Sequence, residues 1–268
     1  MGIRLIAALA LPIALFGCVS HYAGVRRAYA LPLGDVPRMV LLPDVSNFRD
    51  IGGWRAMNGM TVRQGMVYRS GRLNKSWRWY RPDFSRETLS ERTKRFLSVE
   101  LGIRTEIDLR KEINCRGMAE SPIGPEVRFV NIPAKAYDGM ASEDGREAFK
   151  RVFKVLLRQE NYPVLLHCVE GSDRTGSVVF VLNGLLGVSE SDLVKDWELS
   201  RIWNGRDDFV HDRLLARIVP VFDGYNGATL RERIEGYVIS LGFSYEDIEV
   251  FRRLMLSDAK GDTEKGEP

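Results

Sequence analysis

The segment that most constrains the fold of this chain is the decapeptide His-Cys-Val-Glu-Gly-Ser-Asp-Arg-Thr-Gly at residues 167–176. The short apolar run 163–167 before it is typical of a buried strand, and the long apolar run 175–186 after it is typical of a buried helix. A strand, a tight loop and a helix N-terminus in this order direct backbone N–H groups and the helix dipole toward one point. The sequence therefore predicts an anion-binding loop at residues 168–174, called the anion loop below.

Two side chains at the ends of the anion loop indicate chemistry on a bound phosphate. Arg174 can form paired hydrogen bonds to phosphate oxygens, because its guanidinium is planar and always charged. Cys168 lies at the other end, where a helix N-terminus and a nearby cation favour the nucleophilic thiolate. Its attack on phosphorus would give a cysteinyl-phosphate, which water would hydrolyse in a second step.

The neighbouring residues have predicted supporting roles. Asp173 is the nearest carboxyl group that can protonate the leaving oxygen, and Asp138 and Glu170 are the alternatives. Thr175 can donate its hydroxyl to the sulfur and help it leave in the second step. The ring of His167 is expected to hydrogen-bond backbone and hold the loop open. The predicted substrate-binding residues are Val169, Glu170, Gly171 and Ser172.

The anion loop resembles the signature of cysteine-dependent tyrosine and dual-specificity phosphatases. It is most similar to a bacterial and fungal branch, some members of which also act on phosphoinositides. Three further segments match that branch in order and spacing: Asn-Phe-Arg-Asp-Ile-Gly-Gly at 47–53, Val-Tyr-Arg-Ser-Gly at 67–71 and Ile-Asp-Leu-Arg at 107–110. The resemblance covers residues 40–256, and four ordered motifs are more specific than one loop. It implies a tyrosine-phosphatase-like fold and a metal-free, cofactor-free reaction with Asp173 as general acid.

The resemblance also implies which residues support the loop and which substrate it accepts. The expected supporting residues are Arg49, Asp50, Asp108 and Arg110, for which salt bridges that hold the fold are an equally good explanation. Many relatives that act on lipids or inositol phosphates carry a lysine where this chain has Ser172, and Glu170 adds a carboxylate at the rim. A phosphotyrosine-containing protein is therefore the favoured substrate, and a phosphoinositide is the alternative.

Two other classes of function remain open from the sequence. Related cysteine loops serve sulfur transfer and arsenate reduction, but Asp173 and Thr175 are features of phosphoester hydrolysis. A catalytically silent phosphate-binding module is the other alternative, which the intact Cys168 and Arg174 argue against. The formal charge of +3, from 39 basic and 36 acidic residues, is too small to indicate a nucleic-acid partner.

The chain is predicted to form a single α/β domain at residues 39–257, between a linker at 19–38 and a disordered tail at 258–268. Strands predicted at 103–109 and 127–132 alternate with helices predicted at 87–101 and 146–158. This alternation favours a central, mostly parallel sheet flanked by helices on both faces. Asn58 and Gly59 predict a hairpin over 54–66. The C-terminal third is predicted to be helical, at 189–200, 208–221, 227–241 and 245–257, with capping boxes that begin at Ser189 and Ser244.

The N-terminus is predicted to be an export leader, residues 1–18. A basic start is followed by the apolar run 5–17, which is too short to span a membrane, since a span needs about 20 residues. Leu15-Phe-Gly-Cys18 resembles a bacterial lipobox, although Phe16 is larger than the usual residue. We therefore expect an exported lipoprotein anchored to a membrane through Cys18. In a host with two membranes it would face the periplasm from the outer membrane.

Two alternatives to this leader remain: cleavage after Ala30, and an uncleaved N-terminal anchor. Only Cys115 and Cys168 follow the leader, so the chain has no disulfide framework. A regulatory disulfide between these two cysteines is a hypothesis beside the simpler one of a packed Cys115.

The segment 63–81 is rich in basic and aromatic residues and contains no acidic residue. It is either a loop whose aromatic residues cap the core, a rim that attracts acidic phosphopeptides, or a patch that contacts anionic lipid. Its residues are Arg63, Arg69, Arg72, Lys75, Trp77, Arg78, Trp79, Tyr80 and Arg81.

Overall fold

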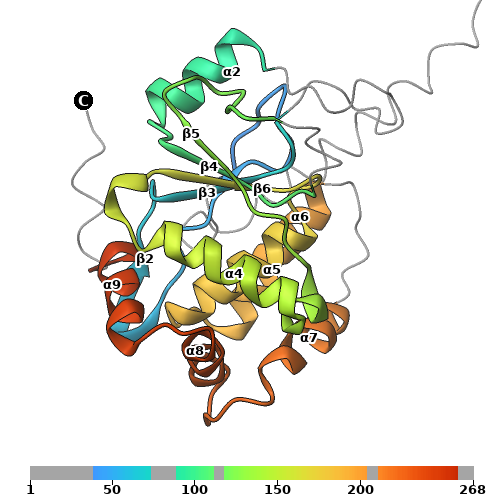
Figure 1. Ribbon diagram of the computed structural model, residues 1–268, viewed down its shortest axis with the longest axis vertical. Helices are drawn as coiled ribbons and strands as arrows, with labels where there is room; N and C mark the ends of the chain where they lie inside the picture. Colours follow the sequence, from blue (N-terminus) through green and yellow to red (C-terminus); the bar gives the residue numbers. More distant parts are fainter. Residues whose placement is uncertain (1–38, 74–88, 112–117, 204–210, 259–268) are drawn as a thin grey trace, which may run out of the picture.

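The computed structural model of the chain describes residues 39–73, 89–111, 118–203 and 211–258 (Figure 1). The leader with Cys18, the second cysteine Cys115 and the C-terminal residues 259–268 lie outside these ranges. The same is true of the part of segment 63–81 that contains Trp77 and Trp79.

The core is a five-stranded sheet with the order β1-β3-β6-β4-β5. Strands β3, β6, β4 and β5 are parallel, and only the edge strand β1 runs antiparallel to its neighbour. The mostly parallel sheet and the strands predicted at 103–109, 127–132 and 163–167 are thus confirmed. The bounds are β1 Arg49–Asp50, β3 Val67–Ser70, β6 Val164–His167, β4 Thr105–Asp108 and β5 Arg128–Asn131.

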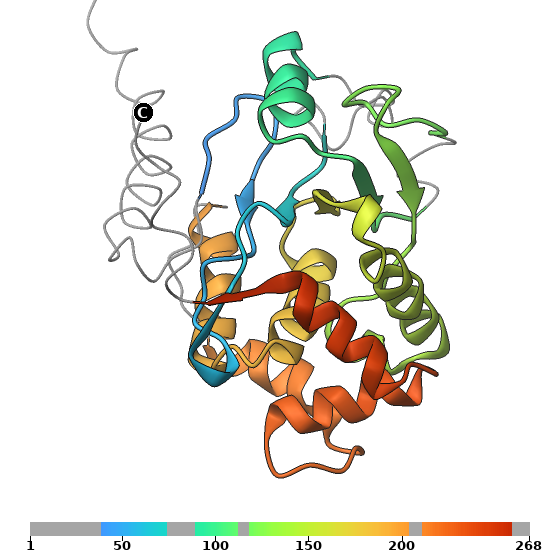
Figure 2. The ribbon, with the colours of Figure 1, turned by 90° about the vertical axis from the view of Figure 1, so that its left-hand side faces the viewer.

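Both faces of the sheet are covered. Along β6, Val164 and Leu166 belong to the large apolar cluster, whereas Leu165 belongs to the smaller cluster, because successive side chains of a strand point to opposite faces. On one face lies α2 (Glu91–Arg95), continued by a π-helical turn at Phe96–Glu100 (Figure 1). The other helices lie on the opposite face, as the turned view also shows (Figure 2). They are α4 Glu143–Leu156, α5 Asp173–Leu185, α6 Glu190–Trp203, α7 His211–Ile218, α8 Leu230–Ser240 and α9 Tyr245–Met255.

Helix α5 is the central helix of this layer, and every residue from Thr175 to Leu185 is buried. Its apolar sequence on all sides follows from this position. The helix predicted at 175–186 is confirmed, but it begins two residues earlier than predicted, because the Ser172 carbonyl accepts a hydrogen bond from the Gly176 amide at 2.8 Å. Asp173 and Arg174 therefore stand on the first helical turn, not in an irregular loop as the sequence indicated.

The predicted hairpin at 54–66 is confirmed around its turn but is shorter than predicted: the Ala56 amide donates to the Met60 carbonyl at 2.8 Å, and the Val62 amide donates to the Trp54 carbonyl at 2.9 Å. Asn58 and Gly59 do adopt positive φ values of 56° and 72° and reverse the chain. The second strand of the hairpin, β2 (Met60–Val62), faces Arg55 through Thr61 on one edge and pairs on its other edge with the C-terminal strand β7 (Leu256–Asp258). Pairing with β7 brings Val62 beside Leu256 in the core, which no local signal indicates. Asp258, assigned to the tail, thus belongs to a strand.

Several predicted helices begin or end elsewhere. The helix predicted from residue 87 begins at Glu91, because Ser90 caps it, and the helix predicted from 146 begins at Glu143, because Ser142 caps it. The last helix ends at Met255, two residues early. The capping boxes predicted at Ser189 and Ser244 form their side-chain bonds to Asp192 and Asp247. Short 3₁₀ turns complete the fold at Met57–Gly59, Tyr137–Ala141, Gln159–Asn161 and Val219–Phe222.

Candidate active site

The anion loop connects the C-terminal end of β6 to the N-terminus of α5, and its backbone carbonyls are held from outside. The Val169 carbonyl accepts a hydrogen bond from the Arg72 amide at 3.0 Å. The Glu170 carbonyl accepts one from Asn47 Nδ2 at 3.0 Å, and the Gly171 carbonyl accepts one from Arg69 Nη2 at 2.6 Å. In a planar trans peptide the N–H points opposite to the C=O. The amides of residues 170–172 are therefore turned toward the inside of the loop, as a bound anion requires.

The tight course of the loop requires glycine at position 171. Gly171 has a φ of 69°, and a Cβ there would lie 2.4 Å from the Ser70 carbonyl oxygen. Any side chain would thus be strained and would collide with backbone that cannot give way.

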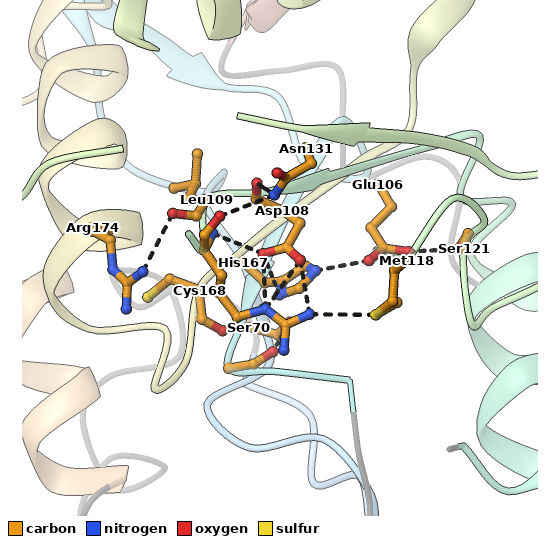
Figure 3. A network of polar contacts seen from close by, with 12 residues as sticks. Ser70, Glu106, Asp108, Leu109, Met118, Ser121, Asn131, His167, Cys168 and Arg174 are labelled. Carbon is orange, nitrogen blue, oxygen red and sulfur yellow. Dashed lines mark hydrogen bonds and ion pairs between the residues drawn. The ribbon is translucent and has the colours of Figure 1, made fainter. Parts of the chain in front are cut away.

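Cys168 and Arg174 occupy the two ends of this cradle. Cys168 is buried, with 2% of its surface exposed, and Arg174 is half-buried on the first turn of α5. The guanidinium of Arg174 is directed toward the carbonyl of Leu109 at 3.4 Å (Figure 3). This contact is long for a hydrogen bond, so a bidentate pair of hydrogen bonds from Arg174 to a phosphate would be stronger.

Thr175 is fully buried behind the loop. Its Oγ1 has no hydrogen-bond partner among the described residues. A buried hydroxyl without a partner costs free energy and needs an explanation. Its position one residue after Arg174 is compatible with the predicted donation to sulfur in the course of the reaction.

His167, directly before Cys168, is held by carboxylates. Its Nε2 lies 2.8 Å from Glu106 Oε1 and its Nδ1 lies 3.9 Å from Asp108 Oδ1, and Figure 3 shows Glu106 between His167 and Ser121. The expected backbone contact is the longer 3.4 Å approach to the Cys168 carbonyl. Burial alone would lower the pKa of His167, but the charges of Asp108 and Glu106 and the hydrogen bond to Glu106 outweigh it and raise the pKa to about 9.

Asp108 and Arg110 form a buried pair at the end of β4. The Arg110 guanidinium donates to both carboxylate oxygens of Asp108, at 2.9 Å from Nε to Oδ1 and at 2.7 Å from Nη2 to Oδ2. Asn131 donates to the carbonyls of both residues at 3.0 Å. The pair therefore fixes the turn whose Leu109 amide holds the His167 carbonyl at 2.8 Å.

A second buried charge cluster lies under the other side of the loop. Asp196 of α6 accepts from Arg49 Nε at 3.2 Å and forms a short ion pair with Arg69. Ser200 Oγ also accepts a hydrogen bond from Arg49 Nη2 at 2.9 Å. Burial and the neighbouring Arg69 lower the pKa of Arg49 to about 10, against the opposing pull of Asp196. Two guanidinium groups and one carboxylate leave net positive charge beneath the anion loop.

The predicted supporting residue Asp50 holds a different segment. Its carboxylate accepts from the Gly52 amide at 2.7 Å and from the Gly65 amide at 2.6 Å. It thereby fixes the path of the chain between β1 and β3. Arg49, by contrast, is joined through Asn47 to the Glu170 carbonyl.

The three candidate acids differ in their surroundings. Asp173 is exposed at the first position of α5, and its Oδ1 accepts a hydrogen bond from the hydroxyl of Tyr137. Asp138 has a side chain that is 76% exposed and pairs with Arg217 at 3.2 Å. Glu170 is exposed on the loop rim. Asp173 alone stands beside Arg174 on the helical turn that faces the cradle.

Sequence reasoning missed several residues of the site. Arg69 was assigned to the exposed basic segment 63–81, which is wrong, because Arg69 is fully buried and binds Gly171 and Asp196. Arg49 and Arg69 need a counter-charge, which Asp196 supplies. The sequence does not indicate this residue, because the helix predicted at 189–200 contains several acids and no pattern shows which of them faces inward. The other missed residues are Asn47, Glu106, Asn131 and Tyr137.

No group of three or more His, Cys, Asp or Glu side chains among the described residues is arranged to hold a metal ion. No helix formed by these residues is both long and apolar enough to cross a membrane.

Comparison with solved structures finds partial similarities at low sequence identity. Pseudomonas aeruginosa TpbA is 17% identical with a TM-score of 0.38, over 69% of this chain and 91% of that one. A form of TpbA in complex with pTyr gives 0.39 at the same identity and coverage. The core catalytic domain of the PP-IP phosphatase SIW14 from Saccharomyces cerevisiae, in complex with citrate, is 14% identical with a TM-score of 0.35, over 64% of this chain and 80% of that one.

Comparison of sequences gives the family. A tyrosine-protein phosphatase of Nostoc commune is 38% identical over 52 residues, which are 19% of this chain and 18% of that protein. The matched segment thus spans less than a fifth of this relative. The profile of the tyrosine phosphatase family matches residues 40–257, which include the whole described sheet and the anion loop. The chain therefore belongs to the tyrosine phosphatase family.

Proposed function

We propose that this chain is a cysteine-dependent phosphomonoesterase that hydrolyses phosphotyrosine without a metal or other cofactor. The observation that carries the proposal is the anion loop, whose carbonyls at residues 169–171 are bonded from outside so that its amides face inward above Cys168. Such a preorganised set of donors stabilises charge that develops on a transferred phosphoryl group.

In the first step the Cys168 thiolate attacks phosphorus and the bond from phosphorus to the leaving oxygen breaks. Arg174 and the loop amides hold the phosphoryl oxygens, and the net positive charge of the buried arginine cluster adds to their attraction. Asp173 gives its proton to the leaving oxygen and becomes a carboxylate. The product is a cysteinyl-phosphate and a free phenol.

In the second step a water molecule attacks the same phosphorus and gives a proton to the Asp173 carboxylate. The bond between sulfur and phosphorus breaks, and the electron pair returns to Cys168 as thiolate. The hydroxyl of Thr175, which has no partner among the described residues, would donate to this sulfur as negative charge develops on it.

The charges at the rim favour a substrate with one phosphate. Glu170 is exposed there, and Arg217 already pairs with Asp138. A highly phosphorylated inositol would need several free cations around the loop, whereas phosphotyrosine needs only the cradle itself. A phosphoinositide with a single phosphate remains the alternative substrate.

The test is phosphate release by the full chain under reducing conditions with a chelator present. The panel contains phosphotyrosine and phosphoserine peptides and monophosphorylated phosphoinositides, and Cys168→Ser is the control. Turnover that Cys168→Ser abolishes supports the proposal, and the ranking of kcat/KM identifies the substrate class. A folded wild-type protein that binds phosphopeptide stoichiometrically but releases no phosphate would indicate a silent binding module instead.

We also propose that the chain is exported and held at a membrane by lipid on Cys18, facing the periplasm in a host with two membranes. The support is the apolar run 5–17 and the lipobox-like segment 15–18. Expression in a bacterium fed labelled palmitate should label the wild-type chain but not Cys18→Ala. Label-free protein in the membrane fraction would favour an uncleaved anchor, and soluble protein would favour cleavage after Ala30.

A further inference from the structure

Tyr137 reaches the anion loop from a separate part of the fold. It begins the 3₁₀ turn Tyr137–Ala141, which lies between β5 and α4. Its side chain is buried, and its hydroxyl donates to Asp173 Oδ1. The proposed general acid, itself exposed, is therefore held by a buried phenol.

Three contacts fix where this phenol lies. The Tyr137 amide donates to Ser177 Oγ at 2.8 Å. The hydroxyl of Ser177 in turn donates to the backbone carbonyl of Asp173 at 2.8 Å. Both ends of Tyr137 are thus attached to the first turns of α5. On the outer side, the guanidinium of Arg217 lies 4.1 Å from the centre of the Tyr137 ring and pairs with Asp138. The backbone of Tyr137 has a φ of 53°, which is rare for a residue with a side chain and persists only where the surroundings impose it.

The phenol keeps its proton throughout the neutral range. Burial, followed by the hydrogen bond to Asp173 and the charge of that carboxylate, raises the pKa of Tyr137 well above its ordinary value. Tyr137 is therefore a donor whether Asp173 is a carboxylic acid or a carboxylate. A neutral donor of this kind does not exchange its own proton during the reaction.

We propose that Tyr137 is the positioning residue of the general acid: by binding Oδ1 of Asp173 it leaves Oδ2 to carry the transferred proton. Oδ2 makes no hydrogen bond with any described residue, so it is available to the substrate. In the first step the proton on Oδ2 passes to the leaving oxygen, and in the second step a proton from water returns to Oδ2. The inference rests on the proposed phosphatase activity and specifies how its acid is oriented.

The test is the dependence of kcat/KM on the leaving group. The full chain and Tyr137→Phe are compared on aryl phosphates that range from p-nitrophenyl phosphate, with a strongly acidic phenol, to phosphotyrosine. A leaving group that is already a stable anion needs little protonation. Tyr137→Phe should therefore lose about ten-fold on the poorest leaving groups but less than about two-fold on p-nitrophenyl phosphate, because only the orientation of the acid is disturbed.

A double-mutant cycle and a matched control make the result specific. In the background of Asp173→Asn, which has no proton to give, Tyr137→Phe should cause no further loss. Tyr162→Phe is the control, because the Tyr162 hydroxyl donates to the Leu156 carbonyl at 2.5 Å and is equally buried but belongs to no part of the site. It should lower the melting temperature without changing the leaving-group dependence.

The outcomes separate the two proposals. A uniform loss across all leaving groups, or an unchanged dependence in Tyr137→Phe, would overturn the positioning role while the phosphatase activity stands. A folded wild type without turnover would overturn both. If Tyr137→Phe does not fold, Arg217→Gln tests the same point, because it keeps the phenol but removes the cation that holds its ring. Like Tyr137→Phe, Arg217→Gln should lower kcat/KM more for poor leaving groups than for p-nitrophenyl phosphate.

Discussion

The buried guanidinium of Arg69 donates a hydrogen bond to the carbonyl oxygen of Gly171 at 2.6 Å, so the backbone of the anion loop is held by a side chain from 102 positions earlier in the chain. The same guanidinium pairs with Asp196 on α6, which also pairs with Arg49. The geometry of the loop thus depends on a charge cluster that never reaches the surface. Changes in this cluster should affect both stability and phosphate binding.

Removal of the charge of Asp196 should be strongly destabilising. Asp196→Asn leaves two buried arginines without a counter-charge, and we expect the free energy of unfolding to fall by about 3–5 kcal/mol. The KM for phosphotyrosine should rise in the protein that remains folded. Urea unfolding measures the loss. The control is Asp223→Asn, because Asp223 is 56% exposed and its pair with Arg233 is worth less than about 1 kcal/mol. Equal losses in both variants would contradict the role of burial.

A methyl group at position 171 should damage the loop more than the same change elsewhere. Gly171→Ala combines a positive φ with a Cβ 2.4 Å from the Ser70 carbonyl, and should cost about 2–5 kcal/mol and most of the activity. Gly59→Ala has a similar φ of 72° but open space around its Cβ, and should cost only about 1 kcal/mol. Thermal unfolding and kcat/KM of both variants distinguish steric collision from backbone strain.

His167 should make the stability of the fold depend on pH. Its pKa is raised from 6.5 to about 9 in the folded protein, so the folded state binds the proton more tightly than the unfolded state. The stabilisation is complete below about pH 6.5 and is lost as the pH rises through about 9, by an amount on the order of 3 kcal/mol. Urea unfolding between these pH values should show the decline, and His167→Asn should flatten it. A decline that persists in that variant would assign it to other groups.

The hydroxyl of Thr175 should matter for the second chemical step and not for stability. In Thr175→Val the release of phosphate from cysteinyl-phosphate should slow about ten-fold or more, because a hydrogen bond to a charged group contributes about 1.5–3 kcal/mol. A rapid burst of p-nitrophenol before slow turnover would show this. The free energy of unfolding should not fall, because Oγ1 has no partner to lose. The matched control Thr93→Val, which removes a 2.8 Å bond to Asp44, should be destabilised without a burst.

The sequence alone predicted the parts of the protein that depend on neighbours in the chain. The strand, the anion loop and the helix at residues 163–186 follow from apolar runs on either side of one glycine-containing loop. The mostly parallel sheet follows from strands that alternate with helices. The roles proposed for Cys168 and Arg174 follow from their side-chain chemistry, which needs no distant partner to be recognised.

The tertiary structure decided what depends on contacts between distant segments. Asp196 lies 127 positions from Arg69, and Tyr137 lies 36 positions from Asp173, so no local pattern links them. The pairing of β2 with β7 and the burial of Arg69 have the same origin. A buried charge or phenol needs a partner, but the sequence did not show that Arg69 and Tyr137 are buried. Which partner meets this need is settled only when the helices pack on the sheet, because packing alone determines which side chains of a helix face inward.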